Sequence, residues 1–318
     1  MPTIVIASQQ PVEGRTVVAA GLGGFLAESG RAVRLARIRA PEGADAPAED
    51  DARTFVAVPG CASSGRAITE QEALALARDA DGAGELLIIE MQPGATNDLA
   101  ARLGARVILV AAPAGDLELG DVAAAAIGLG ASLLGVVLTR QQERRIAAAR
   151  AALEQRNGHC LAALPEDRLL AGPSVRELAE ALHASRLAEG EGEDEALEYV
   201  MLGPISADPG QPYFLQHGSK AVVNRFDKMD LHLAALATEP ACLVLTGGQP
   251  PSPYLLDRVA GSDPGVTVLL SPEDTVRTVE LVDELYGRTR FAGGRKIARA
   301  IELFRSQFNF SEFEAALG

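Results

Sequence analysis

Short apolar runs alternate with helix-length segments along most of this chain. Most of these runs are apolar at consecutive positions, which is typical of strands buried on both faces. Between the runs lie helix-start signals such as Thr69 followed three residues later by Glu72, the spacing of a capping box. The alternation predicts an α/β fold, in which a parallel sheet is covered by helices on both faces. The runs of the first half are Thr3–Ile6, Ala32–Ile38, Glu85–Glu90, Ala105–Ala111, Leu133–Thr139 and Cys160–Leu164.

The pattern restarts after a short acidic, glycine-broken segment, Glu189–Glu195, which predicts a solvated linker. Four further strands and the helices between them predict a second, smaller α/β unit. Earlier in the chain, residues 41–52 are rich in Ala, Pro, Asp and Glu and predict a surface loop. We therefore expect a first domain over residues 1–187, a linker over 188–196, and a second domain over 197–318. The later strands are expected at Tyr199–Ile205, Ala221–Asn224, Ala241–Thr246 and Val266–Leu270.

The first strand leads into a tight loop, Ser8–Gly14, and then into a helix that begins with Arg15 and Thr16. This order is that of a nucleotide-phosphate loop, in which backbone N–H groups and the helix N-terminus hold phosphate oxygens. However, Gln9 stands where the Walker A pattern has its first glycine, and Arg15 stands where it has lysine. Because a planar guanidinium does not replace a compact ammonium, the loop is degenerate. The alternative is an ordinary strand-to-helix turn in which Thr16 caps the helix.

A carboxylate, Glu90, ends the strand that precedes Met91, as in a second nucleotide-site motif where an acidic group orients Mg²⁺. Parallel strands present their carboxyl ends at one edge of the sheet, and ligands bind there. We therefore expect Glu90 and Thr139 beside the loop, with Thr16 and Glu90 as candidate Mg²⁺ ligands. The alternative is that Glu90 only caps a loop. The candidate ligand-binding residues of this domain are Ser8, Glu13, Gly14, Arg15, Thr16, Glu90 and Thr139.

The second domain has polar and glycine residues at the carboxyl ends of two of its predicted strands. Adjacent glycines let a ligand approach the backbone closely. The alternative is a plain turn before the two prolines at 250 and 251. The candidate ligand-binding residues here are Arg225, Asp227, Thr246, Gly247 and Gly248.

Composition excludes several classes of partner. The net charge is −14 and the isoelectric point is about 4.8, which argues against nucleic acid or an anionic membrane as a partner. No uninterrupted apolar run of about 18 residues is present, and the N-terminus has no basic region before its first strand. We therefore expect a cytoplasmic protein. The three widely spaced cysteines, Cys61, Cys160 and Cys242, predict core residues rather than a disulfide framework or a zinc site.

These motifs, in this order, resemble those of a known domain pair. The strand–loop–Gly-Arg-Thr–helix, the strand ending in Glu90 and the segment LAALPEDRLLAGPSVRELAEAL resemble a dethiobiotin-synthetase-like P-loop domain. The segments VNRFD, LTGG and EDT of the second half resemble the DRTGG domain that follows it. The pair is similar to the amino-terminal part of long bacterial phosphate acetyltransferases, whose acetyltransferase domain has no counterpart here. Asn224-Arg225 stands where the second domain has its name-giving Asp-Arg.

The resemblance implies a regulatory or sensing protein that binds a nucleotide such as ATP, or another anionic metabolite, with Mg²⁺ as a candidate companion ion. Because the loop is degenerate, we assign no catalytic residues and expect neither a competent ATPase nor an acetyltransferase. One alternative is an ATP-dependent ligase of the dethiobiotin-synthetase type, with Thr16 and Glu90 on Mg²⁺. Another is a purely structural partner of an enzyme. The resemblance also implies a homo-oligomer, for which the apolar tail with Phe308, Phe310 and Phe313 is a candidate surface unless it packs on its own core.

Overall fold

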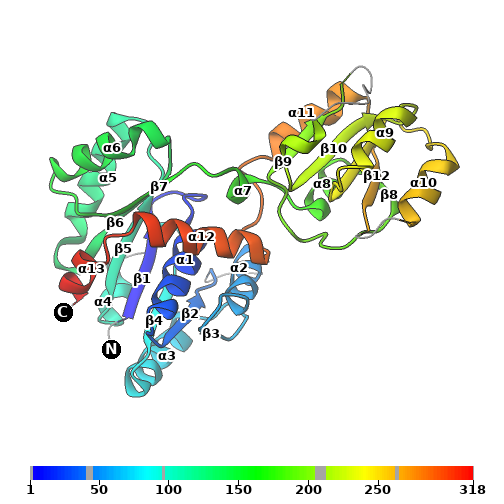
Figure 1. Cartoon of the computed structure of the whole chain (residues 1–318). Helices are drawn as coiled ribbons and strands as arrows, with labels where there is room; N and C mark the ends of the chain where they lie inside the picture. The colour runs from blue at the N-terminus through cyan, green and yellow to red at the C-terminus, as the bar shows by residue number, and fades with distance from the viewer. Residues whose placement is uncertain (1–2, 41–45, 95–96, 205–212, 262–264, 318) are drawn as a thin grey trace. The chain divides into compact units, whose positions relative to one another are not determined.

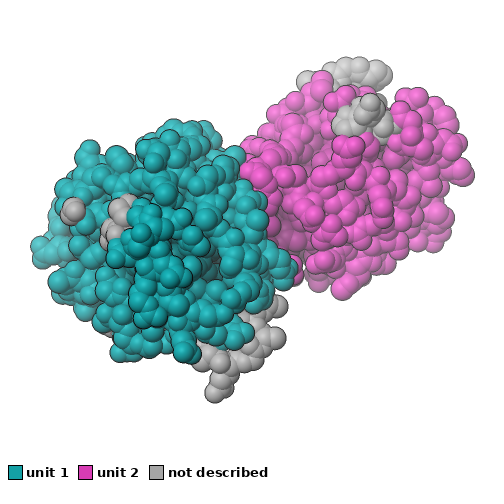
Figure 2. Space-filling view, turned by 90° about the horizontal axis from the view of Figure 1, so that it is seen from below, with its two compact units in different colours: residues 1–167, 297–318 teal, residues 168–296 magenta. Residues whose placement is uncertain are grey.

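The computed structural model describes residues 3–40, 46–94, 97–204, 213–261 and 265–317 (Figure 1). The chain forms two compact units, which Figure 2 shows in different colours. Unit 1 comprises residues 1–167 together with 297–318, and unit 2 comprises residues 168–296. Both units are α/β, so the predicted fold class is confirmed.

Unit 1 is built on a seven-stranded parallel sheet with the order β3-β2-β4-β1-β5-β6-β7. All strands but short β3 follow predicted runs, because consecutive Val, Ile and Leu residues bury both faces of the sheet. The strands are β1 (Thr3–Ser8), β2 (Val33–Arg37), β3 (Cys61–Ser63), β4 (Leu86–Glu90), β5 (Arg106–Ala111), β6 (Leu133–Gln141) and β7 (Cys160–Pro165).

Helices cover both faces of this sheet (Figure 1). The Thr69–Glu72 capping box is present at the start of α3, as predicted. Residues 46–56 form a helix where a loop was expected over 41–52, of which 41–45 lie outside the described residues. The helices are α1 (Arg15–Glu28), α2 (Ala46–Val56), α3 (Glu70–Ala83), α4 (Asn97–Arg102), α5 (Asp116–Leu129), α6 (Ile146–Glu154), α12 (Gly294–Gln307) and α13 (Phe310–Leu317), with short 3₁₀ turns at 130–132 and 143–145.

Unit 2 is built on a five-stranded sheet with the order β8-β12-β11-β10-β9, in which only β8 is antiparallel. Two apolar clusters fill its faces, one against α8 and α11 and the other against α9 and α10. The strands are β8 (Ser185–Ala188), β9 (Tyr199–Leu202), β10 (Lys220–Arg225), β11 (Cys242–Thr246) and β12 (Thr267–Leu270). The helices are α7 (Arg168–Ala171), α8 (Val175–Ala181), α9 (Met229–Leu236), α10 (Pro253–Ala260) and α11 (Thr275–Leu285), with a 3₁₀ turn at 214–216.

The C-terminal helices belong to unit 1 rather than to the second unit, which differs from the expected domain over 197–318. Helix α12 packs closely on α1 because α1 has glycines at the contact. A Cβ on Gly21 would lie 2.7 Å from Phe304 Cδ2, and a Cβ on Gly24 would overlap Ile301. The chain therefore leaves unit 1 at residue 167 and returns to it at residue 297.

The aromatic tail packs on unit 1 as well. The Phe25 ring of α1 makes edge contacts with Phe308 and Phe310, at centroid distances of 5.9 and 5.8 Å. Phe308 also contacts Phe304 and Phe313, and Phe313 is fully buried. These rings pack against one another within a single chain. The tail therefore forms part of the core of unit 1, which was the alternative to its being an oligomer surface.

The acidic segment expected as a solvated linker over 188–196 is instead anchored inside unit 2. Arg176 pairs with Asp194 at 2.6 Å and Arg186 pairs with Glu193 at 3.3 Å. The Glu195 carboxylate accepts hydrogen bonds from the backbone N–H groups that begin α12, at 3.1 and 3.2 Å. Three carboxylates of this segment, those of Glu193, Asp194 and Glu195, therefore have partners distant from them in the chain, which the local sequence does not reveal. None of the described helices combines the length and the apolar character needed to cross a membrane.

Candidate functional site

The loop between β1 and α1 has a defined shape. Gly14 adopts a left-handed conformation (φ 87°), which turns the chain into the first residue of α1. The Thr139 hydroxyl of β6 donates to the Glu13 carbonyl at 2.8 Å, and the Gln10 N–H donates to the Glu13 carboxylate at 3.0 Å. Glu13 and Thr139 therefore hold the loop in place, and Gly14 starts the helix beside them.

The Arg15 side chain folds back towards the sheet rather than out to solvent. Its Nη1 donates to the Ser8 hydroxyl and, at 3.2 Å, to the Gln10 carbonyl. Its Nε lies 3.6 Å from Glu90 Oε1, and only 9% of the side chain is exposed. Arg15 thus connects the end of β1, the loop and the end of β4.

Three side chains converge on one oxygen of Glu90. Glu90 Oε1 lies 3.1 Å from the Thr16 hydroxyl, 3.6 Å from Arg15 Nε and 3.5 Å from Arg37 Nε. Arg37, which β2 places in register with Glu90, also lies 3.3 Å from Asp51 of α2. We call these five residues, Arg15, Thr16, Arg37, Asp51 and Glu90, the Glu90 cluster. Glu90 Oε2 and Arg15 Nε are buried without a hydrogen-bond partner.

Burial controls the ionisation of this cluster. Glu90 is 1% exposed, and burial raises its pKa to about 7 even though Arg37 and Arg15 favour its charged form. Burial also raises the pKa of Asp51, which Arg37 opposes. When every group is ionised, two guanidinium groups balance two carboxylates. The net charge of the cluster in that state is therefore close to zero, and Glu90 is the group whose pKa lies close to neutral pH.

The predicted metal ligands Thr16 and Glu90 do lie together, at 3.1 Å. However, the same carboxylate oxygen already faces two guanidinium groups, and a divalent cation placed there would be repelled by both. Among the described residues, no group of three or more His, Cys, Asp or Glu side chains is arranged to hold a metal ion. The geometry therefore favours an ion-paired Glu90 over a Mg²⁺-bound one.

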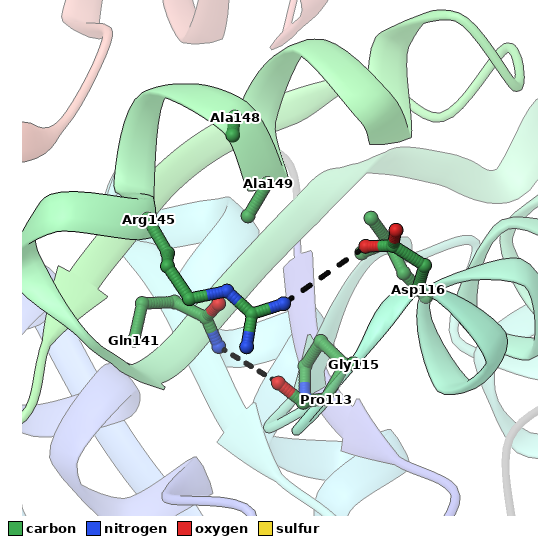
Figure 3. Close-up of a pocket in the computed structure, with 8 residues that line it drawn as sticks. Pro113, Gly115, Asp116, Gln141, Arg145, Ala148 and Ala149 are labelled. Atoms are coloured by element: carbon green, nitrogen blue, oxygen red, sulfur yellow. Dashed lines mark hydrogen bonds and ion pairs between the residues drawn. The ribbon is translucent and has the colours of Figure 1, made fainter.

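A small pocket lies at the carboxyl ends of β5 and β6 (Figure 3). Thr139, whose hydroxyl donates to the Glu13 carbonyl, lies on β6 close to this end. Gln141 donates to the Pro113 carbonyl at 3.3 Å, and Arg145 donates to the Ala114 carbonyl at 3.0 Å. Arg145 also lies 3.9 Å from Asp116. No sequence motif predicts this pocket, whose polar side chains pair with each other and with nearby backbone carbonyls.

The candidate residues of unit 2 lie at the carboxyl edge of its sheet but use their polar groups locally. Arg225 pairs with Asp227 at 3.0 Å, and the Thr246 hydroxyl lies 2.7 Å from that of Thr275. The N–H groups of Gly247 and Gly248 donate to backbone carbonyls, at 2.7 and 3.0 Å. Both glycines have positive φ (98° and 65°), so the turn itself requires them. The turn interpretation accounts for this pair without a ligand.

Two buried polar side chains of unit 2, Asn224 and His232, are not among the predicted ligand-binding residues. Asn224 is 2% exposed and neither amide atom has a hydrogen-bond partner. Its Oδ1 fills the space where a Cβ on Gly203 would stand. His232 Nε2 lies 2.9 Å from the Arg225 carbonyl, and Nδ1 is buried without a partner. Burial lowers the pKa of His232, which favours the neutral ring with its proton on Nε2.

Comparison with known proteins identifies one family. The model of the DRTGG domain matches residues 177–285, which lie entirely within unit 2. Unit 2 contains a DRTGG domain. This confirms the second half of the resemblance seen in the sequence.

Several solved structures resemble part of this chain, at low sequence identity and low TM-score. The MinD cell division protein of Aquifex aeolicus is 16% identical, with a TM-score of 0.38 over 54% of this chain and 84% of that one. A nucleotide-binding protein from Archaeoglobus fulgidus in complex with ADP is 12% identical, with a TM-score of 0.34 over 52% and 82%. The CBS and DRTGG regulatory region of Clostridium perfringens pyrophosphatase, complexed with diadenosine tetraphosphate, is 12% identical, with a TM-score of 0.32 over 47% and 72%. At these values the likenesses carry no argument about function.

Proposed function

We propose that this protein is a regulatory protein that binds an anionic metabolite, with a nucleotide as the first candidate, at the start of α1 and does not hydrolyse it. The observation that carries this proposal is the convergence of Arg15 and Thr16 at the first turn of α1. The first N–H groups of a helix have no partner within the helix, and its dipole favours a negative charge there. A guanidinium and a hydroxyl beside those groups complete a site for a phosphate.

The same geometry argues against hydrolysis. The carboxylate that would position Mg²⁺ or a water molecule is Glu90, and two guanidinium groups and a hydroxyl converge on it. Arg15 replaces the compact lysine that reaches the outer phosphates in competent loops. We therefore expect binding without turnover, and we assign no catalytic residue.

The DRTGG domain adds to the regulatory part of the proposal, because the resemblance implies that this domain accompanies enzymes as a regulatory region. We further propose a relation to the amino-terminal region of phosphate acetyltransferases, a cytoplasmic location, and assembly with a second copy of the chain or with an enzyme. Cross-linking of purified protein, followed by mass analysis, tests the assembly.

One observation favours a second function. Thr16 and Glu90 lie 3.1 Å apart, within reach of a single cation if Arg15 and Arg37 were to move. An ATP-dependent ligase would need this arrangement. It predicts Mg²⁺-dependent consumption of ATP that Thr16→Ala abolishes.

Isothermal titration of the full chain with ATP, ADP and AMP, each with Mg²⁺ and with EDTA, tests the proposed function. We expect binding that survives EDTA and that weakens by about 10- to 100-fold in Arg15→Ala, the loss for one charge-assisted hydrogen-bonding group. Arg34→Ala is the matched control, because Arg34, like Arg15, pairs with a glutamate: it lies 2.7 Å from Glu85, away from the start of α1. An absence of heat with all three nucleotides, or equal losses in both variants, would contradict the proposal.

A further inference from the structure

The two side chains that the proposed ligand needs are already bound to a carboxylate of the protein. Arg15 Nε and the Thr16 hydroxyl both face Glu90 Oε1, at 3.6 and 3.1 Å. A phosphate at the start of α1 would compete with Glu90 for both groups, because each offers a limited number of hydrogen-bond donors. The Glu90 carboxylate is therefore an anion of the protein itself that competes with external anions for Arg15 and Thr16.

Glu90 also has a second cationic partner, Arg37, which would still pair with its carboxylate if the Arg15 side chain moved away. Arg37 Nε lies 3.5 Å from the same oxygen and is 3% exposed. It extends from β2, the strand next to β4, and it is not part of the loop or of α1. Removing one partner from a buried charge is costly unless another remains. The Glu90–Arg37 pair supplies that second partner.

We propose that Glu90 determines the affinity of this site, by holding Arg15 and Thr16 until an external anion takes them and by keeping Arg37 as its partner when they leave. This inference rests on the proposed function and adds its regulation. It also connects the site to α2, because Arg37 is shared between Glu90 and Asp51. Ligand binding would then strengthen the Arg37–Glu90 pair at the expense of Arg37–Asp51.

The charge balance of the cluster shows what Glu90 contributes. The charged and polar groups that face Glu90 are Arg15 and Thr16 from α1, Arg37 from β2 and Asp51 from α2, while β1 presents the apolar Ile6 in register. Glu90→Gln would leave the cluster with two cations and one anion, so an external anion would restore neutrality. The variant is therefore expected to bind an anion more tightly than wild type.

The size of the effect is that of one charge-assisted hydrogen-bonding group. In wild type an external anion must displace Glu90 from Arg15, whereas the neutral amide of Glu90→Gln does not compete as a charge. We therefore expect the Kd of wild type to exceed that of Glu90→Gln by about tenfold.

The experiment is titration of ATP in EDTA into the full chain at one pH, for wild type, Glu90→Gln and Glu85→Gln. The quantity compared is the ratio of the wild-type Kd to the variant Kd. We expect Glu90→Gln to bind about tenfold more tightly than wild type. Glu85→Gln, which breaks the Glu85–Arg34 pair near the start of the same strand, is expected to behave as wild type.

The outcomes separate this inference from the function beneath it. Binding to wild type with a ratio near one for Glu90→Gln overturns the role of Glu90 and leaves the proposed function intact. No binding to wild type or to Glu90→Gln overturns both. If Glu90→Gln does not fold, Glu90→Asp keeps the carboxylate on a shorter side chain that reaches Arg15 less well, and we expect binding tighter than that of wild type. Equal or weaker binding in Glu90→Asp would overturn the inference.

Discussion

Replacing Phe304 by alanine should destabilise unit 1 and leave unit 2 unchanged. Phe304 belongs to α12, it is fully buried, and it contacts Phe308 at a centroid distance of 5.6 Å. It also lies against α1 at Gly21. Truncation of a buried phenylalanine costs about 3–5 kcal/mol, since the ring leaves a cavity that the surroundings fill only in part. A loss of this size approaches the whole stability of a typical domain.

Hydrogen exchange followed by mass spectrometry tests this prediction, because it measures the exchange rate of each segment separately. In Phe304→Ala we expect faster exchange in β1 and β5 of unit 1 and unchanged exchange in β10 and β11 of unit 2. Leu245→Ala is the matched control, because Leu245 is fully buried in β11 and its truncation should have the opposite pattern. The assignment of the C-terminal helices would be refuted if Phe304→Ala loosened β10 and β11 while β1 stayed protected. That result would restore the domain over residues 197–318.

Three further predictions concern stability. Gly203→Ala should destabilise unit 2 in chemical denaturation, because its Cβ would overlap the Asn224 side chain. Adding Asn224→Ala should remove that overlap, so the double variant should be more stable than the sum of the two single effects predicts. Additive effects of the two substitutions on the free energy of unfolding would contradict the contact. Ser174→Ala should cost about 1 kcal/mol by removing the capping box of α8, whereas an unchanged unfolding midpoint would refute it. Because the pKa of Glu90 is raised from 4.5 to about 7, its contribution to stability is greatest below pH 4.5 and is lost as the pH rises through 7. Wild type should therefore lose stability relative to Glu90→Gln between pH 5 and 8, and parallel pH profiles would contradict this.

Local patterns predicted most of the regular structure. Both sheets, the strand that ends in Glu90 and the Thr69–Glu72 capping box were visible because hydrophobic periodicity and capping depend on neighbours in sequence. Helix α2 was missed since the acidic composition of 41–52 was read as a loop. The return of the chain to unit 1 at residue 297 was missed for a different reason. It depends on close packing between α1 and α12, nearly 280 residues apart in the chain.

The candidate site was predicted in part. The loop residues, Thr16, Glu90 and Thr139 do lie together, because parallel strands present their carboxyl ends at one edge. Arg37 and Asp51 were not identified. Arg37 ends β2, a strand that also contains Arg34, and nothing in its local sequence indicates a buried ion pair with Glu90. Pairings of this kind depend on the strand order of the sheet.

The central claim is that an anion binds at the start of α1 and is not hydrolysed, and ³¹P NMR of ATP mixed with the full chain tests it most directly. Wild-type protein should broaden or shift the phosphate signals, no inorganic phosphate should appear with Mg²⁺ over hours, and Arg15→Ala should restore the spectrum of free ATP. An unchanged ATP spectrum with wild type would contradict binding at this site. Growth of an inorganic phosphate signal that Thr16→Ala abolishes would contradict the absence of hydrolysis.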